Sequence, residues 1–178
     1  MVTGAAGVRD PRISVVWSAL DEIPDPEIPH VSLVELGVIG GVTFDKLEAG
    51  GERLRVELLP TFVGCPAIDV MRQQIDERLR AMRVATEVMV EISFREPWTS
   101  DRISPEGREK LRQAGFAPPA RIGSTFAGDE LQLLIASAEC PYCGSANTTL
   151  ENPFGPTLCR AIYHCADCRQ PFEQFKTV

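Results

Sequence analysis

The sequence predicts an α+β protein: a small mixed three-stranded sheet with packed helices, followed by a β module built around four cysteines. Between residues 12 and 114, apolar residues recur in the order helix, strand, strand, helix, strand, helix. Five of the six cysteines lie in residues 140–178, which carry 3 basic and 3 acidic residues, whereas residues 1–139 carry 15 and 22. This change in composition predicts a domain over 1–117, a linker over 118–137 and a second module over 138–178.

The first half of the domain is predicted to contain one helix and one hairpin. Residues 12–23 show helical spacing of apolar side chains, and the prolines that follow exclude regular structure from Asp25 to His30. Residues 38–44 and 54–59 have strand character, and Gly50 and Gly51 between them favour a hairpin turn.

The second half begins where a strand is expected to turn into a helix at Cys65. An apolar stripe from Ile68 to Met82 predicts that helix, and strict alternation over 88–94 predicts the third strand. Ser104 has the residue type and position of an N-cap, with Pro105 at the first helical position and Gly115 as the stop.

Composition and charge exclude several classes of function. The formal net charge of −7 is unfavourable for binding nucleic acid, which needs clustered Lys and Arg. No apolar run approaches the length of a membrane span, and Met1–Pro11 lacks the apolar core of a signal peptide. We therefore expect a cytoplasmic protein that contacts neither nucleic acid nor membrane. In that reducing compartment, cysteines serve more often as metal ligands or reactive thiols than as disulfides.

The four-cysteine module carries the strongest signal in the sequence. Two Cys-x-x-Cys pairs, Cys140 with Cys143 and Cys165 with Cys168, are separated by 21 residues. This spacing is typical of a structural zinc ribbon, because two such pairs complete a tetrahedron of thiolates. Zinc is the expected ion, and iron is an alternative for four thiolates. Cys159 and His164 stand outside the pattern, although either could replace a ligand. His164 is expected at the surface or behind a ligand, and Cys159 is expected to pack against the metal site or to be a spare thiol.

Cys65 is the second candidate for chemistry. If Pro66 occupies the first helical position, Cys65 is the N-cap and faces unpaired backbone N–H groups at the positive end of the helix dipole. This setting predicts a lowered thiol pKa and hence a thiolate, the form that binds metals and attacks electrophiles. The alternative is a small apolar residue packed at a strand end.

Two motifs together resemble a known domain family. Asp25-Pro26-Glu27-Ile28-Pro29, followed by residues 32–39, stands before the first strand, and Leu59-Pro60-Thr61 with Gly64-Cys65-Pro66-Ala67 follows the second. They closely resemble the small iron–sulfur assembly domain shared by SufT and the cytosolic iron–sulfur targeting factors. With residues 96–101 and 111–119 and the cysteine ribbon, the chain is similar to the PaaD family.

The resemblance implies an accessory role in phenylacetate degradation. It assigns the iron–sulfur assembly type to domain 1–117 and suggests that the protein helps to mature or insert the iron–sulfur or di-iron centre of phenylacetyl-CoA epoxidase. The implied partners are components of that epoxidase or the iron–sulfur assembly machinery. Cys65 matches the characteristic cysteine of the family, and Asp25 and Glu27 match its Asp-Pro-Glu motif. Leu59 replaces the first threonine of the usual Thr-Pro-Thr.

The expected site for transient iron or an iron–sulfur cluster consists of Cys65, Asp25, Glu27 and Thr61. One thiolate and two carboxylates are too few to hold a cluster tightly, since clusters usually take four cysteines, and a weak site suits transfer. A homodimer could bring two Cys65 thiolates together. The two carboxylates are alternatively caps for backbone N–H groups in the proline-rich loop. Thr61 donates to the thiolate or simply fills a strand.

Three further functions compete with this one. The chain could be a non-catalytic docking component of the oxygenase complex, or a ribbon that binds nucleic acid. It could also be an enzyme that uses Cys65 as a nucleophile, but His30 is the only histidine of the domain and no catalytic base is evident. The sequence therefore favours a protein that is not an enzyme.

Overall fold

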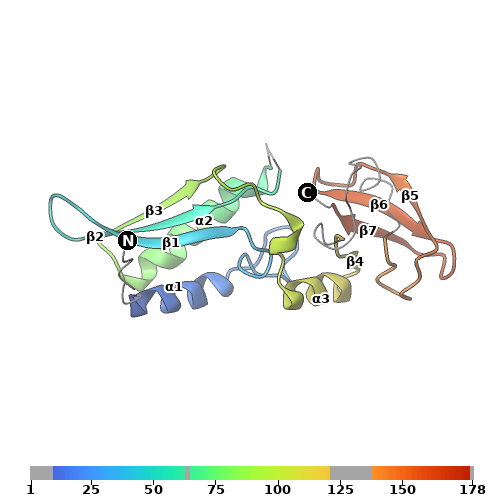
Figure 1. Cartoon of the computed structure of the whole chain (residues 1–178), viewed down its shortest axis with the longest axis horizontal. Helices are drawn as coiled ribbons and strands as arrows, with labels where there is room; N and C mark the ends of the chain where they lie inside the picture. The colour runs from blue at the N-terminus through green and yellow to red at the C-terminus, as the bar shows by residue number, and fades with distance from the viewer. Residues whose placement is uncertain (1–9, 63–64, 121–137, 177–178) are drawn as a thin grey trace, which may run out of the picture.

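The computed structural model describes residues 10–62, 65–120 and 138–176 and contains the α+β fold and the second β module that the sequence predicts (Figure 1). The helices are α1 (Pro11–Asp21), α2 (Ala67–Met82), the short 3₁₀ helix η1 (Ser100–Arg102) and α3 (Pro105–Gln113). The strands are β1 (Ile39–Lys46), β2 (Glu52–Leu58), β3 (Glu87–Ile92), β4 (Phe116–Ala117), β5 (Thr148–Asn152), β6 (Arg160–Cys165) and β7 (Pro171–Phe175). Among the described residues, none of the helices combines the length and the apolar character needed to cross a membrane.

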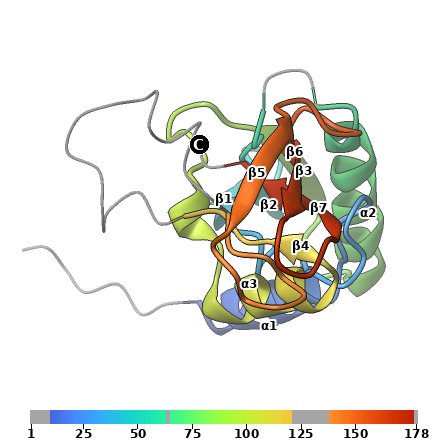
Figure 2. The same cartoon turned by 90° about the vertical axis from the view of Figure 1, so that its right-hand side faces the viewer.

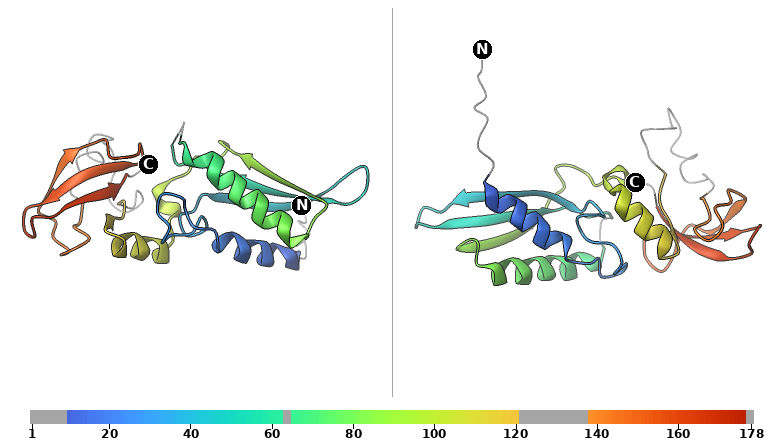
Figure 3. Two further views of the ribbon diagram at one scale, coloured as in Figure 1. Left: turned by 180° about the vertical axis from the view of Figure 1, so that it is seen from behind. Right: turned by 90° about the horizontal axis from the view of Figure 1, so that it is seen from below.

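The first sheet is mixed, as predicted, with the strand order β1-β2-β3. β1 and β2 form an antiparallel hairpin, and β2 pairs with β3 in parallel. Gly50 and Gly51 in the hairpin turn have φ values of +89° and +92°, a region that favours glycine. α1 and α2 lie on one face of the sheet (Figure 3). Leu54, Val56 and Leu58 of β2 are fully buried, as the alternation of a half-buried strand requires.

Side-chain caps fix the start of two helices. The Asp10 carboxylate accepts the Arg12 N–H before α1, and the Ser104 hydroxyl accepts the Gly107 N–H before α3. The predicted cap of α3 is thus confirmed, and the helix stops before Gly115, which has a φ of +85°.

The prediction for the start of α2 is wrong by one residue. The helix begins at Ala67 with Pro66 as its N-cap, so Cys65 lies one residue before the cap. The reason is a tight turn in which the Cys65 carbonyl accepts the Ile68 N–H at 3.3 Å, three residues ahead rather than four.

The second sheet has the strand order β4-β7-β6-β5 (Figure 2). β5, β6 and β7 form an antiparallel meander, and β4, which directly follows α3, pairs in parallel with β7. The last two residues of the predicted first domain, 1–117, therefore form a strand in the sheet of the second module. Most of the predicted linker, residues 121–137, lies outside the described residues.

The two sheets are joined by a shared core. Cys159 and Phe175 of the second module belong to the same buried apolar cluster as the residues under the first sheet. The Phe175 ring meets the edge of buried Trp98 at a centroid distance of 5.7 Å, and the Trp98 indole N–H donates to the Leu36 carbonyl at 3.0 Å. The second module is thus packed against the loops of the first domain.

A turn over residues 32–37 anchors α3 to the first domain. The Ser32 and Glu35 side chains each accept a hydrogen bond from the other's backbone N–H, as in a capping box, and Lys110 forms an ion pair with Glu35 at 2.5 Å. Gly107 allows the helix to lie directly on this turn, since a Cβ there would be 2.7 Å from the Glu35 carbonyl oxygen.

We expect Gly107→Ala to lower the free energy of unfolding by about 1–3 kcal/mol, because the helix must move away from the turn. Denaturant unfolding followed by circular dichroism measures the change. Gly41→Ala is the matched control, since its Cβ would lie 3.7 Å from the nearest side-chain atom. Equal stability of the two variants would contradict the close packing of α3.

Candidate metal centres

The four cysteines of the second module converge on one point. The sulfurs of Cys140, Cys143, Cys165 and Cys168 all lie within 4.8 Å of one another. Two of the separations, Cys140 to Cys168 and Cys143 to Cys165, are 3.6 Å. Four sulfurs at about 2.3 Å from a zinc ion stand about 3.8 Å apart at the corners of a tetrahedron. The site therefore fits a four-coordinate ion of zinc size, with no position left for a substrate.

The two Cys-x-x-Cys turns have the same backbone hydrogen bonds. Cys140 N–H donates to the Ser145 carbonyl and Gly144 N–H donates back to the Cys140 carbonyl, at 2.9 Å each. In the second turn, Cys165 N–H donates to Gln170 and Arg169 N–H donates to Cys165, at 3.0 and 2.9 Å. Gly144 and Arg169 occupy equivalent positions with φ values of +75° and +60°. Both positions require a positive φ. Glycine adopts it without strain in the first turn, whereas Arg169 in the second turn is strained.

Polar groups tie the two turns together, and backbone N–H groups favour the thiolate of Cys165, whereas the pKa values of Cys143 and Cys168 are raised. The Asp167 carboxylate accepts from the Ser145 hydroxyl at 2.5 Å and from the Asn147 amide at 2.8 Å. Backbone N–H groups of Cys168 and Asp167 directed at the sulfur lower the pKa of Cys165 to about 7. His164 lies on β6 opposite Thr149 and is not part of the cluster of sulfurs.

A second, smaller site lies where the two modules meet. A cavity of about 20 Å³ is lined by all four residues expected to hold the cargo and by one further thiol from the second module. Such a volume admits a group about the size of one water molecule. The polar and thiol-bearing residues in its wall are Asp25, Glu27, Thr61, Cys65 and Cys159, and Met71 adds a thioether sulfur.

Asp25 is both a loop cap and a wall of this cavity. Its side chain is only 6% exposed, and Oδ1 accepts the N–H groups of Glu27 and Ile28 at 2.9 and 2.8 Å. Within the described part of the chain, both hydrogen bonds to this carboxylate go to Oδ1. Burial raises the pKa of Asp25, against the effect of the two N–H donors. The capping interpretation thus describes one oxygen of Asp25, and the second oxygen remains for another partner.

Glu27 has a partner in the second module. The Arg160 guanidinium lies 3.3 Å from the Glu27 carboxylate and 3.1 Å from that of Glu173 on β7, and it packs over the Phe116 ring at 5.0 Å. Arg160 is 8% exposed. The carboxylate expected to serve as a ligand or orienting group therefore also holds the two modules together.

The prediction of a lowered Cys65 pKa is wrong. Burial raises the pKa of the Cys65 thiol, and the Glu27 and Asp25 carboxylates raise it further, whereas the N–H groups of Ala67 and Ile68 lower it. The amides of the helix start do point at the sulfur, as expected. Burial in the cavity outweighs them, and this tertiary effect is absent from a local motif.

Sequence reasoning missed the role of Cys159 in this wall. The residue is 6% exposed, its sulfur lies 3.1 Å from the Thr157 hydroxyl, and burial raises its pKa, to which Cys65 also contributes. Its only signal in the sequence was negative, since it falls outside the Cys-x-x-Cys spacing. Its partner Cys65 is remote along the chain, so only the packing of the modules brings them together.

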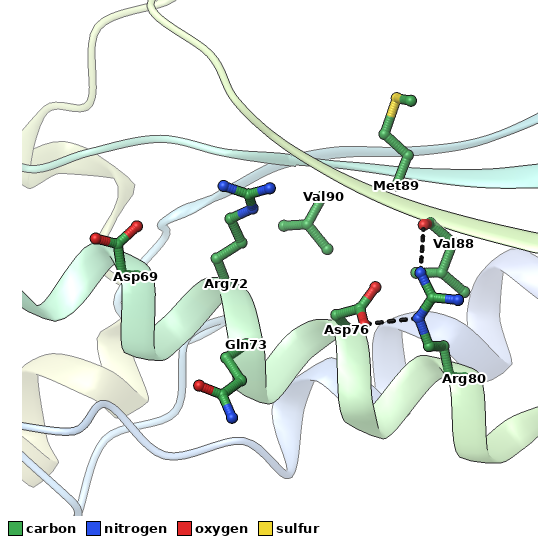
Figure 4. Close-up of a pocket in the computed structure, with 8 residues that line it drawn as sticks. All are labelled: Asp69, Arg72, Gln73, Asp76, Arg80, Val88, Met89 and Val90. Carbon is green, nitrogen blue, oxygen red and sulfur yellow. Dashed lines mark hydrogen bonds and ion pairs between the residues drawn. The ribbon is translucent and has the colours of Figure 1, made fainter.

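A larger hollow between α2 and β3 contains no cysteine (Figure 4). It measures about 490 Å³, and Arg80 within it pairs with Asp76 at 2.6 Å and donates to the Val88 carbonyl at 3.3 Å. Since β3 is an edge strand, Arg80 covers part of its open edge. Because Arg80 and Asp76 of this hollow already pair with each other, and because it contains no thiol, the cysteine cavity is the better candidate site.

Comparison with known proteins identifies the family. Residues 13–92 match a family described as iron–sulfur cluster assembly protein, and residues 129–176 match the PaaD zinc beta ribbon domain. The chain is 36% identical, over 97% of its own length and 98% of the relative's, to an Escherichia coli K12 protein that is provisionally named as a component of 1,2-phenylacetyl-CoA epoxidase. The chain belongs to the PaaD family.

Two further matches of this PaaD family member cover about half of the chain. The Bacillus subtilis Fe-S protein maturation auxiliary factor YitW is 29% identical over 50% of this chain and 82% of its own length. A crystal structure of a domain of unknown function from Bacillus anthracis aligns with 56% of this chain over 90% of its own length, with 23% identity and a TM-score of 0.49. The family model of the ribbon and the cluster of four sulfurs together identify a metal-binding zinc ribbon.

Substitutions at the two equivalent turn positions should affect the stability of the ribbon differently. We expect Gly144→Ala to destabilise the ribbon by about 1–2 kcal/mol, because alanine must enter the left-handed region. We expect Arg169→Gly to leave stability within about 0.5 kcal/mol, since relief of strain offsets the entropy that glycine adds to the unfolded chain. Zinc competition with a chromophoric chelator measures both. An equal loss of zinc affinity in the two variants would refute the equivalence of the turns.

Arg160→Met is expected to lower the free energy of unfolding by about 3 kcal/mol, because it leaves Glu27 and Glu173 facing one another without a cation. Thermal and urea unfolding measure the loss. Arg112→Met is the control, since the ion pair of Arg112 with Glu109 lies on the exposed surface of α3. If both variants unfold at the same denaturant concentration, Arg160 does not join the modules.

Proposed function

We propose that this protein is a non-catalytic accessory factor of the phenylacetyl-CoA epoxidase system, which delivers iron or an iron–sulfur cluster to a metal-containing component through Cys65. The observation that carries the proposal is the cavity in which Cys65 meets Asp25, Glu27 and Thr61. The domain that supplies all four belongs to a family described by iron–sulfur cluster assembly. The full-length similarity to the E. coli protein supports the link to the epoxidase.

The chemistry of the two metal centres supports a division of roles. Four thiolates in a closed tetrahedron hold a zinc ion for structure and expose no ligand position. By contrast, Cys65 and the carboxylates do not form a compact set. Among the described residues, the ribbon cysteines are the group of three or more ligands within 4.8 Å of one another. A site that is not preformed binds more weakly, and a transfer protein must release what it binds.

The second candidate is a docking component, in which the ribbon contacts the oxygenase complex and Cys65 has no metal role. The ribbon exposes three large apolar side chains, those of Tyr142, Phe154 and Leu158. They favour docking, because such side chains are commonly buried in protein interfaces. The two candidates differ in the effect that loss of the Cys65 thiol has on the iron content of the epoxidase complex.

We expect cells that produce Cys65→Ser in place of the wild-type protein to yield epoxidase complex with severalfold less iron and correspondingly lower epoxidation of phenylacetyl-CoA. Iron analysis and activity of the purified complex provide the measurement. Asp69→Asn is the control, since Asp69 is exposed on α2 and does not line the cavity. Full iron content with Cys65→Ser, together with normal co-purification, would overturn delivery through Cys65 and favour docking.

A further inference from the structure

The thiol of Cys159 enters the wall of the Cys65 cavity from the second module. It lies in the turn directly before β6, which begins at Arg160, whereas Cys65 precedes α2 in the first domain. Both residues line the same cavity of about 20 Å³, and both belong to the same packed apolar cluster. Cys159 is thus set apart from the four ribbon cysteines, whose sulfurs surround a different point.

The environment of Cys159 is built to hold it at this wall. Its backbone carbonyl accepts the Lys176 N–H at 2.8 Å, and the next residue is fixed by Glu27 and Glu173. The Lys176 ammonium donates to the Leu158 carbonyl at 2.8 Å and lies over the rings of Phe62 and Phe154. Phe62 lies three residues before Cys65. Lys176 over Phe62 and Arg160 paired with Glu27 therefore connect the surroundings of Cys159 to the first domain at two places.

We propose that Cys159 is the second thiolate ligand of the iron cargo, so that the transfer site spans both modules of the chain. Two soft thiolates and the free Oδ2 of Asp25 form a better donor set for iron than a single thiolate. In the described state these three donors do not all lie within 4.8 Å of one another, so the walls must close to bind one ion and would have to separate to hold a cluster. Each thiol releases a proton when it binds iron.

This inference rests on the proposed function, because it assumes that Cys65 binds iron. It also assigns the ribbon a task beyond its own stability. Zinc holds the turns of the module, and the module places Cys159 opposite Cys65. Iron bound between the thiols would connect the two modules, and breaking the single bond to Cys159 would release it from the second module.

The test is anaerobic titration of the zinc-loaded full-length protein with ferrous iron, measured by equilibrium dialysis and by thiolate-to-iron absorption. We expect the wild type to bind one iron per chain in addition to zinc. Cys159→Ser and Cys65→Ser should each bind at least tenfold more weakly, since even groups behind the ligands are worth about 10–100-fold in metal affinity. Leu158→Ser, an exposed neighbour in the same loop, is the matched control and should bind as the wild type does.

The outcomes separate the inference from the proposed function. Equal binding by wild type and Cys159→Ser, with loss in Cys65→Ser, overturns the role of Cys159 and leaves Cys65 as the cargo ligand. Equal binding by all variants, or no iron bound by the wild type, overturns both. If Cys159→Ser loses zinc and hence the fold of the ribbon, iron-edge X-ray absorption of the wild type decides. Two cysteine sulfurs per added iron support the inference, and one refutes it.

Discussion

The buried guanidinium of Arg160 is the contact on which the arrangement of this molecule depends. A charge that is removed from water must be paired, and Arg160 meets Glu27 of the first domain and Glu173 of its own sheet. The pairing fixes where the ribbon stands relative to the Asp25–His30 loop. It also fixes Cys159, which precedes Arg160 in the chain, at the wall of the cavity that contains Cys65. Without this ion pair, the candidate site would lose the wall that the ribbon supplies.

The six thiols divide into two sets with opposite requirements. Four of them lie at tetrahedral separations on turns that repeat the same hydrogen bonds, a geometry that binds an ion tightly and closes around it. Cys65 and Cys159 come from different modules, and their positions are set by packing rather than by a shared turn. Tight binding suits a structural metal, whereas a site assembled across an interface can open by small movements of one module. The two sets therefore suit retention and exchange respectively.

Local signals predicted most of the fold and half of the chemistry. Ser104 as a cap, Gly50 and Gly51 as a turn, and the Cys-x-x-Cys pairs all act within a few residues, so their effects can be deduced from the sequence. The pairing of β4 with β7 could not be deduced, because two residues carry no periodicity. The helix dipole predicted a lowered pKa for Cys65, but burial raises it, and the burial comes from residues far along the chain. Cys159 was missed for the same reason.

The structure also explains why a ribbon should accompany an assembly-type domain. In the first domain alone, Cys65 would face solvent beside two carboxylates, and Glu27 would have no cation. The ribbon supplies the cation, a second sulfur and the apolar cover of Phe175 against Trp98. These contributions exist only while the ribbon is folded, and a module of this size with a small core depends on its metal for folding. A structural ion in the ribbon would thereby maintain the cavity that is proposed to hold the iron cargo.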